Sequence, residues 1–170
     1  MREADEEYAG FEREEMPPLD MFEALFDARS WSYDRVTEDE LSAEYKGSWT
    51  SYQMRIVSRE EDPVAQLLIL PDISVGKSRR AELYEALALI NEQLWMGHFD
   101  LWSNNGVILF RHAVALGSDG MIDIAQAQTL IDAAIDECER FYPVFQFVLW
   151  GGKSPAEAIA SALIDTYGEA

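Results

Sequence analysis

The residues best suited to chemistry in this sequence are two histidines, and neither comes with the partners that catalysis requires. His98 and His112 are the only histidines in the chain. Acid–base or metal chemistry needs an imidazole that a second group holds in a defined orientation. His98 follows Gly97, a glycine typical of helix ends, and His112 stands in an apolar run of strand character. We therefore expect structural roles for both.

The other candidate groups also favour structural interpretations. Cys138 lies on an apolar helical stripe with no basic cluster nearby, which predicts a small buried hydrophobe. Gly76-Lys77-Ser78 matches only the end of a phosphate-binding loop, although the basic stretch Val75–Arg80 opens a helix and leaves a weak anion site as an alternative. Glu60-Glu61-Asp62 lacks the loop pattern of calcium-binding proteins. We predict no catalytic residue, no cofactor, no metal site and no enzymatic activity.

Composition excludes several classes of partner. The 170 residues suit one domain, and a hydrophobic fraction of 48% is enough for a core. The formal charge of -19 repels nucleic acid and anionic lipid. A single cysteine fits a reducing compartment, and the acidic first residues differ from a signal peptide, which is basic and then apolar. The most apolar run, Phe141–Trp150, is too short to span a bilayer, so we expect a cytoplasmic protein.

Hydrophobic periodicity predicts an α+β fold. Leu41–Trp49 and Tyr52–Arg59 alternate as half-buried strands do, whereas Val64–Leu70 is apolar almost throughout and should be covered on both faces. Asn104-Asn105-Gly106 tolerates positive φ and predicts a hairpin turn. The elements expected in chain order are helix 20–30, strands 41–49, 52–59 and 64–70, a helix between Ser78 and Gly97, strands 99–102 and 107–116, and helices 124–142 and 155–166.

These elements follow the order α-β-β-β-α-β-β-α-α and predict an antiparallel sheet of about five strands with helices packed on it. Residues 1–18 form an acidic segment that we expect to be a disordered tail. Residues 19–152 form the α+β domain, and residues 153–170 form a C-terminal helix extension.

Local signals mark several helix ends. Ser78 is the predicted N-cap of the central helix, and Gly97 is expected to close it in a left-handed conformation. Asp123 with Gln126 resembles a capping box at the start of the long C-terminal helix. Pro143 is expected to break or kink that helix, because proline lacks the amide hydrogen.

Two expected strands carry more apolar surface than helices on one face can cover. Val64–Leu70 and Val107–Leu116 are apolar on both faces, so a second subunit or a partner segment would cover the remainder. The alternative is that the C-terminal helices cover this surface within one chain. The candidate partner-binding or dimer-interface residues are Leu67, Ile69, Val107, Leu109, Phe145, Phe147 and Trp150.

The segments Ile90–Trp102 and Gly106–His112 resemble the signature of the bacterial YbjN-domain family, whose members are described as sensory transduction regulators. The specific parts are the Ile-Asn pair, the Gly-x-Phe after the helix and the Phe-Arg of the hairpin. The resemblance covers roughly residues 20–150. It implies an antiparallel sheet with helices, similar to type III secretion chaperones, which bind extended partner segments and are often dimers. It implies no catalytic residues.

We therefore expect a non-enzymatic protein-binding module, a chaperone-like adaptor or regulator of bacterial signalling or stress response that forms a homodimer. The alternative is a small-molecule sensor or an unrecognised enzyme with a pocket between sheet and helices, where Trp95, Trp102 and Arg111 would supply contacts. Arg111 is otherwise expected to form a structural ion pair, since it is a charge in an apolar strand. No nucleic-acid or membrane partner is expected.

Overall fold

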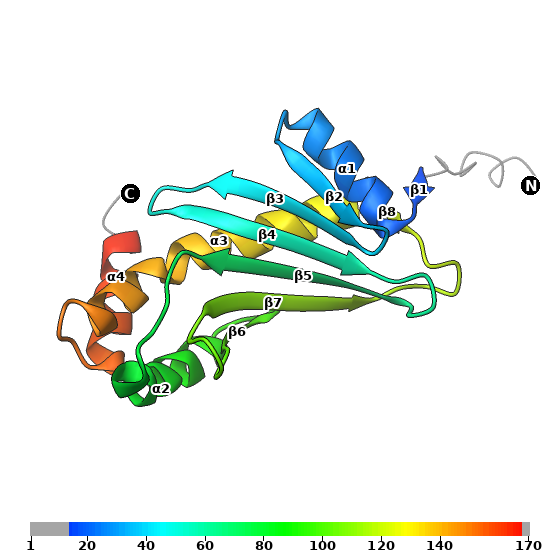
Figure 1. Cartoon of the computed structure of the whole chain (residues 1–170). Helices are drawn as coiled ribbons and strands as arrows, with labels where there is room; N and C mark the ends of the chain where they lie inside the picture. The colour runs from blue at the N-terminus through cyan, green and yellow to red at the C-terminus, as the bar shows by residue number, and fades with distance from the viewer. Residues whose placement is uncertain (1–13, 168–170) are drawn as a thin grey trace, which may run out of the picture.

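The computed structural model describes residues 14–167, with side chains up to residue 163, and shows an α+β fold built on one large antiparallel sheet (Figure 1). In the described chain this sheet has six strands in the order β2-β3-β4-β5-β7-β6. Its strands are β2 (Tyr33–Thr37), β3 (Glu40–Lys46), β4 (Ser51–Ser58), β5 (Val64–Pro71), β6 (His98–Leu101) and β7 (Ile108–Ala115). The expected fold class is confirmed, with one strand more than the sequence predicted.

The additional strand is β2, at one edge of the sheet. It pairs with β3, and its register shifts between Arg35 and Thr37. Most of its residues are exposed. An edge strand of this kind has no buried face to maintain, so it lacks the alternation that revealed its neighbours.

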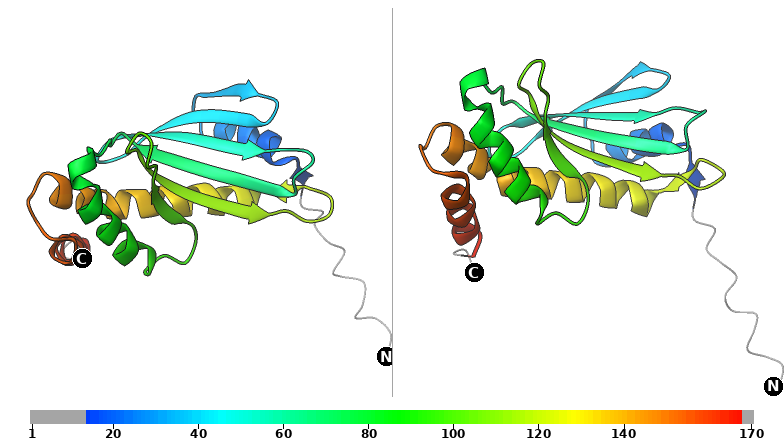
Figure 2. Two further views of the ribbon diagram at one scale, coloured as in Figure 1. Left: turned by 60° about the horizontal axis from the view of Figure 1, so that its bottom comes forward. Right: turned by 90° about the horizontal axis from the view of Figure 1, so that it is seen from below.

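The helices gather on one side of the sheet and at one end of it (Figures 1 and 2). Helix α1 (Pro18–Ala28) packs on β4 and on α3 (Ile124–Leu149), which runs beneath β5 and β7. Helix α2 (Arg80–Asn91) and helix α4 (Pro155–Tyr167) pack on one another near the C-terminal end of α3. Among the described residues no helix covers the opposite face of the sheet. No described helix is both long and apolar enough to cross a membrane.

Alternation along β4 explains why the sheet buries only one face against helices. Tyr52, Met54 and Ile56 are buried toward α1 and α3, whereas Gln53 and Arg55 are exposed on the helix-free face. The more apolar β5 also buries residues on the second face, as expected, because Leu68 is only 7% exposed there.

Helix α3 begins as predicted and ends later than predicted. The Asp123 carboxylate accepts a hydrogen bond from the Gln126 amide at 2.8 Å, and the Asp123 amide donates to Gln126 Oε1 at 2.9 Å, which confirms the capping box. Of the break or kink expected at Pro143, the break is wrong, because α3 continues to Leu149. Proline at this position leaves the Glu139 carbonyl without its helical donor, and the Trp49 indole Nε1–H donates to that carbonyl at 3.1 Å instead.

The predicted ends of α2 are also wrong. The helix starts at Arg80 after a short 3-10 turn, η1 (Lys77–Arg79), and its start has no side-chain cap from Ser78. It ends at Asn91, well before Gly97. The Asn91 side chain instead joins the helix to β6: its Oδ1 accepts from the Phe99 amide at 2.8 Å and its Nδ2 donates to the Phe99 carbonyl at 3.0 Å.

Near the N-terminus, a small second sheet joins the start of the described chain to the start of α3. Strand β1 (Glu15–Met16) pairs with β8 (Ile122–Asp123). The acidic tail expected at residues 1–18 lies mostly outside the described residues, and its last residue, Pro18, begins α1. The expected C-terminal helix is present as α4 and packs against α2 and α3.

Candidate functional site

Strand β6 covers only half of β7 and leaves the other half open. β5 pairs with β7 from Ile69↔Phe110 to Val64↔Ala115, whereas β6 starts at His98, opposite Arg111. No described strand therefore pairs with residues 112–115 on the β6 side, and β7 runs on past β6 in Figure 1. An interior strand thus becomes an edge strand halfway along its length.

The bonding groups of Ala113 and Ala115 point out of this open edge. In an antiparallel strand, the N–H and C=O of successive residues point alternately to the two sides. On β7 the even side faces β5, since the Leu116 amide donates to the Pro63 carbonyl at 2.8 Å. The odd side faces β6, since the Val107 carbonyl accepts from the Trp102 amide at 3.0 Å. The described chain offers the outward groups of Ala113 and Ala115 no backbone partner, and both residues are exposed.

Gly97 is the reason why β6 stops where it does. Its φ is +69°, a left-handed value that favours glycine, and it directly precedes His98, the first residue of β6. A Cβ at this position would lie 2.8 Å from the Arg111 carbonyl oxygen and would collide with the Phe110 ring. Glycine therefore permits both the close approach to β7 and the bend that takes the preceding loop off the sheet.

An apolar hollow lies beside the open edge, between β7 and the N-terminal half of α3. Its volume is about 340 Å³. Its apolar walls are the side chains of Met96, Val114 and Leu130, and Gln126 and Thr129 stand on the α3 side. A second hollow of about 400 Å³ lies on the other side of the start of α3. It is lined by Glu14, Met16, Met21, Ala24, Asp123, Ile124 and Ala125.

His112 also lines the first hollow and is half-buried there. Burial lowers the pKa of its imidazole below the ordinary 6.5, and the nearby His98 lowers it further. The imidazole is therefore mainly neutral at pH 7, and the hollow is lined by uncharged groups apart from the capping carboxylate of Asp123.

Trp95 stands next to the hollow in sequence and is fully exposed, at 100%. Trp95 belongs to the loop between α2 and β6, which leaves the sheet at Gly97, and the next residue of that loop, Met96, lines the hollow. Large aromatic residues are rarely left in water by monomeric folds and are enriched where proteins bind one another. Trp95 therefore extends the candidate site beyond the edge and the hollow.

The charged residues near the hairpin form a surface network on the helix-free side. Arg111 forms the expected ion pair, with Asp100 at 3.8 Å, and His98 Nε2 lies 3.2 Å from the same carboxylate. All three side chains are at least one-third exposed. Such a pair contributes little stability, because water screens it.

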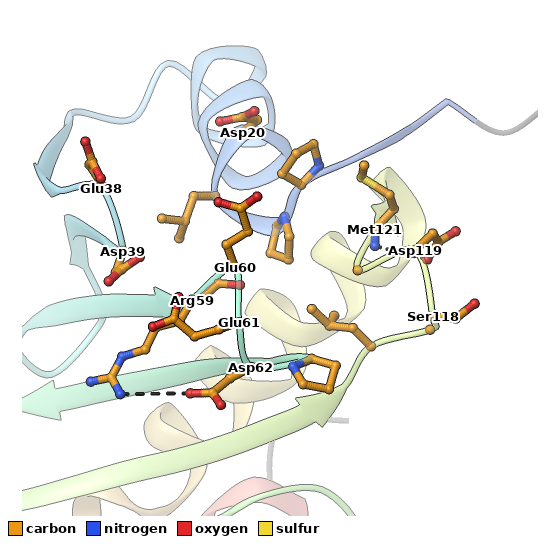
Figure 3. Close-up of a pocket in the computed structure, with 18 of the residues that line it drawn as sticks. Asp20, Glu38, Asp39, Arg59, Glu60, Glu61, Asp62, Ser118, Asp119 and Met121 are labelled. Carbon is orange, nitrogen blue, oxygen red and sulfur yellow. Dashed lines mark hydrogen bonds and ion pairs between the residues drawn. The ribbon is translucent and has the colours of Figure 1, made fainter.

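A separate acidic hollow of about 660 Å³ lies at one end of the sheet (Figure 3). The start of α1, the β2–β3 and β4–β5 turns and the loop after β7 converge there. Its carboxylates belong to Asp20, Glu38, Asp39, Glu60, Glu61, Asp62 and Asp119. Arg59 lies 3.9 Å from Asp62, and Arg35 pairs with Asp20 at 3.1 Å. The described residues contain no His, Cys, Asp or Glu group that could hold a metal ion.

The interface residues predicted from sequence are mostly inside the domain. Leu67, Ile69, Leu109 and Phe145 are buried within this chain and are not accessible to a partner. Leu67 and Ile69 face the helices, which is the alternative that the sequence left open. The remaining candidates are Val107 and Phe147, which are partly buried, and Trp150, which is 65% exposed.

The pocket proposed for a small molecule does not form from the predicted residues. Trp95 is in solvent, and Arg111 lies on the helix-free face with Asp100. Cys138 is buried, and burial raises the pKa of its thiol, which agrees with its interpretation as a small hydrophobe.

Sequence reasoning missed the open edge at Ala113–Ala115, although a signal for it was present. The predicted hairpin has arms of very unequal length, 99–102 and 107–116. The longer arm must extend past the shorter one unless another strand pairs with it.

Comparison with known proteins identifies the family. A family model named YbjN, with the description "Putative bacterial sensory transduction regulator", matches residues 18–147. The chain belongs to the YbjN family. The crystal structure of YbjN from E. coli, titled a "putative transcription regulator", is similar with a TM-score of 0.52 and 12% identity, over 87% of this chain and 93% of that chain. No curated protein matches this sequence.

The YbjN-like segments meet in space at the start of the open edge. Asn91, from the Ile-Asn pair, is bonded to Phe99, from the Gly-x-Phe segment. The Phe99 ring packs edge-on against Phe110 at 5.3 Å, and Phe110 precedes Arg111 in the hairpin. These residues fix the end of α2, the bend at Gly97 and the start of β6. The parts of the sequence that resemble YbjN therefore position the edge.

Proposed function

We propose that this YbjN-family protein is a non-enzymatic regulatory module that binds an extended segment of a partner protein as an additional strand along β7. The observation that carries the proposal is the unpaired stretch at Ala113–Ala115, which lies beside an apolar hollow. An exposed edge supplies main-chain hydrogen bonds to any extended chain, and a neighbouring pocket selects particular side chains. The YbjN resemblance seen in the sequence implies a likeness to type III secretion chaperones, which bind extended segments, and that analogy agrees with the proposal.

The bound segment would make contacts of two kinds. Its backbone would bond to the N–H and C=O groups of Ala113 and Ala115, each bond contributing about 0.5–1.5 kcal/mol net. An apolar side chain of the segment would enter the hollow beside Val114, where burial contributes about 1.5–3 kcal/mol. Ordering the segment offsets much of this gain, so we expect micromolar affinity.

The charge of the chain indicates the composition of the segment. A formal charge of -19 attracts basic sequences and repels acidic ones. We therefore propose a partner segment that alternates apolar and polar residues and carries Lys or Arg. Its association should slow as salt is added, because salt screens this attraction.

A selection experiment tests the proposal. A random peptide library would be selected against the full chain alone, and the selected peptides would then be tested for binding to the double variant A113P/A115P, which lacks both outward amides. We expect apolar-alternating, basic peptides that bind the wild type and lose at least about tenfold in affinity for the double variant. Amide hydrogen exchange should show new protection at Ala113 and Ala115 when a selected peptide is added.

The matched control is A113S/A115S, which changes the same side chains and keeps both amides. This variant should bind the selected peptides as the wild type does. Selected peptides that bind A113P/A115P equally well would contradict the proposal, as would protection confined to residues away from β7.

A further inference from the structure

We infer that a second copy of this chain occupies the open edge when no partner is bound, so that the protein inhibits its own binding site by dimerising through β7. The inference rests on the proposed function, because it assigns a competitor to the same edge. It differs from the interface expected from sequence, which consisted mainly of residues that are buried in the core.

The first argument is the two-fold register of the edge. A two-fold axis can place Val114 opposite Val114 of the second copy. In that register Ala113 lies opposite Ala115 of the second copy, and Ala115 lies opposite Ala113 of the second copy. Ala113 and Ala115 are the residues whose N–H and C=O point outward. Each such pair in an antiparallel ladder exchanges both of its bonds. Every outward group at these two positions is therefore bonded in this register, and the two sheets become continuous.

The second argument is that the edge lacks the features that prevent self-association. Natural edge strands are protected by charged residues, proline, bulges or very short length. The unpaired stretch His112–Leu116 contains no proline and no residue with a permanent charge, and its outward positions are both alanine. The opposite edge, β2, has Asp34, Arg35 and an irregular register. Strand β6, at the other end of the sheet, has only four residues, and the Asn91 side chain bonds to both the amide and the carbonyl of its Phe99. The open stretch of β7 has neither kind of protection.

The third argument is that pairing would complete the apolar hollow. An antiparallel ladder also contains non-hydrogen-bonded pairs, in which the Cα atoms are only about 4.5 Å apart and the two side chains lie close together. Val114 would face Val114 of the second copy in this way, on the side where Met96 and Leu130 line the hollow. Leu116, which is half-buried, would come opposite the His112 of the other copy.

Electrostatics distinguishes this dimer from the partner complex. Each copy carries a formal charge of -19, so two copies repel one another at low salt. Salt screens that repulsion and strengthens the dimer, whereas it weakens binding of a basic peptide. The two occupants of the edge should therefore respond to salt in opposite directions.

Sedimentation velocity of the full chain tests the inference, from low micromolar to near-millimolar concentration and at low and moderate salt. We expect a reversible monomer–dimer equilibrium that salt strengthens. A115P should raise the dissociation constant at least about tenfold, because half of the bonds across the interface lose their donor. A115S keeps the amide and should dimerise as the wild type does. A wild type that stays monomeric at both salt concentrations, or a dimer that A115P leaves unchanged, overturns the inference.

A competition experiment separates this inference from the proposed function. Selected peptides should dissociate the wild-type dimer. If the wild type is monomeric and its peptide binding is lost in A113P/A115P, the inferred dimer is refuted and the proposed partner site remains supported. If the wild type forms a dimer that A115P disrupts but that no selected peptide dissociates, the inferred dimer is supported and the proposed partner site is refuted.

Discussion

A directional proline scan of β7 tests the feature on which both proposals depend. The scan compares V114P with A115P, substitutions at adjacent residues of the same strand. The Val114 amide points toward β5, where Val114 pairs with Ala65, and the Ala115 amide points into the open edge. Both preceding residues are extended, as a following proline requires. The backbone restraint is therefore similar in the two variants, and the direction of the lost donor differs.

The structure gives the expected size of the difference. V114P removes a donor from the middle of the sheet and leaves the Ala65 carbonyl, on a buried residue, without its partner. That loss costs about 1–3 kcal/mol. A115P removes a donor that has no partner in the described chain, at an exposed residue, so its effect on unfolding should stay within about 0.5 kcal/mol. V114P should therefore lower the melting temperature by about 2–12 °C more than A115P.

Urea unfolding followed by tryptophan fluorescence provides the measurement. The protein should be kept at low micromolar concentration and low salt, so that the monomer dominates. A113P serves as the control, because Ala113 lies on the same side as Ala115 and should behave like it. Equal destabilisation by V114P and A115P would refute the assigned direction of the bonding groups, and with it the open edge.

Three further predictions concern other parts of the domain. W49F should lower the free energy of unfolding by about 0.5–1.5 kcal/mol, because the Trp49 indole donates to the Glu139 carbonyl. In a P143A background residue 143 regains an amide that can donate to that carbonyl, so W49F should destabilise the protein less. A double-mutant cycle measures this coupling, and strictly additive effects of the two substitutions would contradict it. D123A should lower the free energy of unfolding by about 0.5–2 kcal/mol, measured by thermal or urea unfolding, because it removes the N-cap of α3. D123S keeps a capping oxygen and should retain most of the stability, and equal losses in the two variants would argue against capping. The pKa of His112 in the folded state lies below the ordinary 6.5, so the unfolded state binds more protons, and the free energy of unfolding falls as the pH drops below about 6.5. In H112Q the free energy of unfolding should fall less steeply between pH 7 and pH 5. Identical slopes for the wild type and H112Q would exclude this contribution of His112.

Several features of the fold follow from local sequence alone. The alternation in β4, the capping box at Asp123 and the hairpin around Gly106 were predicted and are present. Each depends on interactions within a few residues or on which face of one strand is apolar. Hydrophobic periodicity also predicted the α+β fold class, with which the YbjN resemblance agreed, and the six-stranded antiparallel sheet confirms it.

Other features depend on contacts between distant parts of the chain. Proline at position 143 predicts a break or a kink by itself, whereas in the fold the helix is continuous and the Trp49 indole, more than ninety residues earlier, donates to the carbonyl that the proline leaves without a helical donor. Leu67 and Ile69 are apolar in sequence whether a partner or a helix covers them, and it is α1 and α3 that cover this face of the sheet.

The open edge belongs to the second group. The sequence determined that the arms of the hairpin are unequal and that Gly97 can adopt a positive φ. It did not determine whether another strand would pair with Ala113 and Ala115, because strand pairing is a long-range choice that any extended segment can satisfy. The tertiary structure decided it by placing β5 on one side of β7 and ending β6 at His98 on the other.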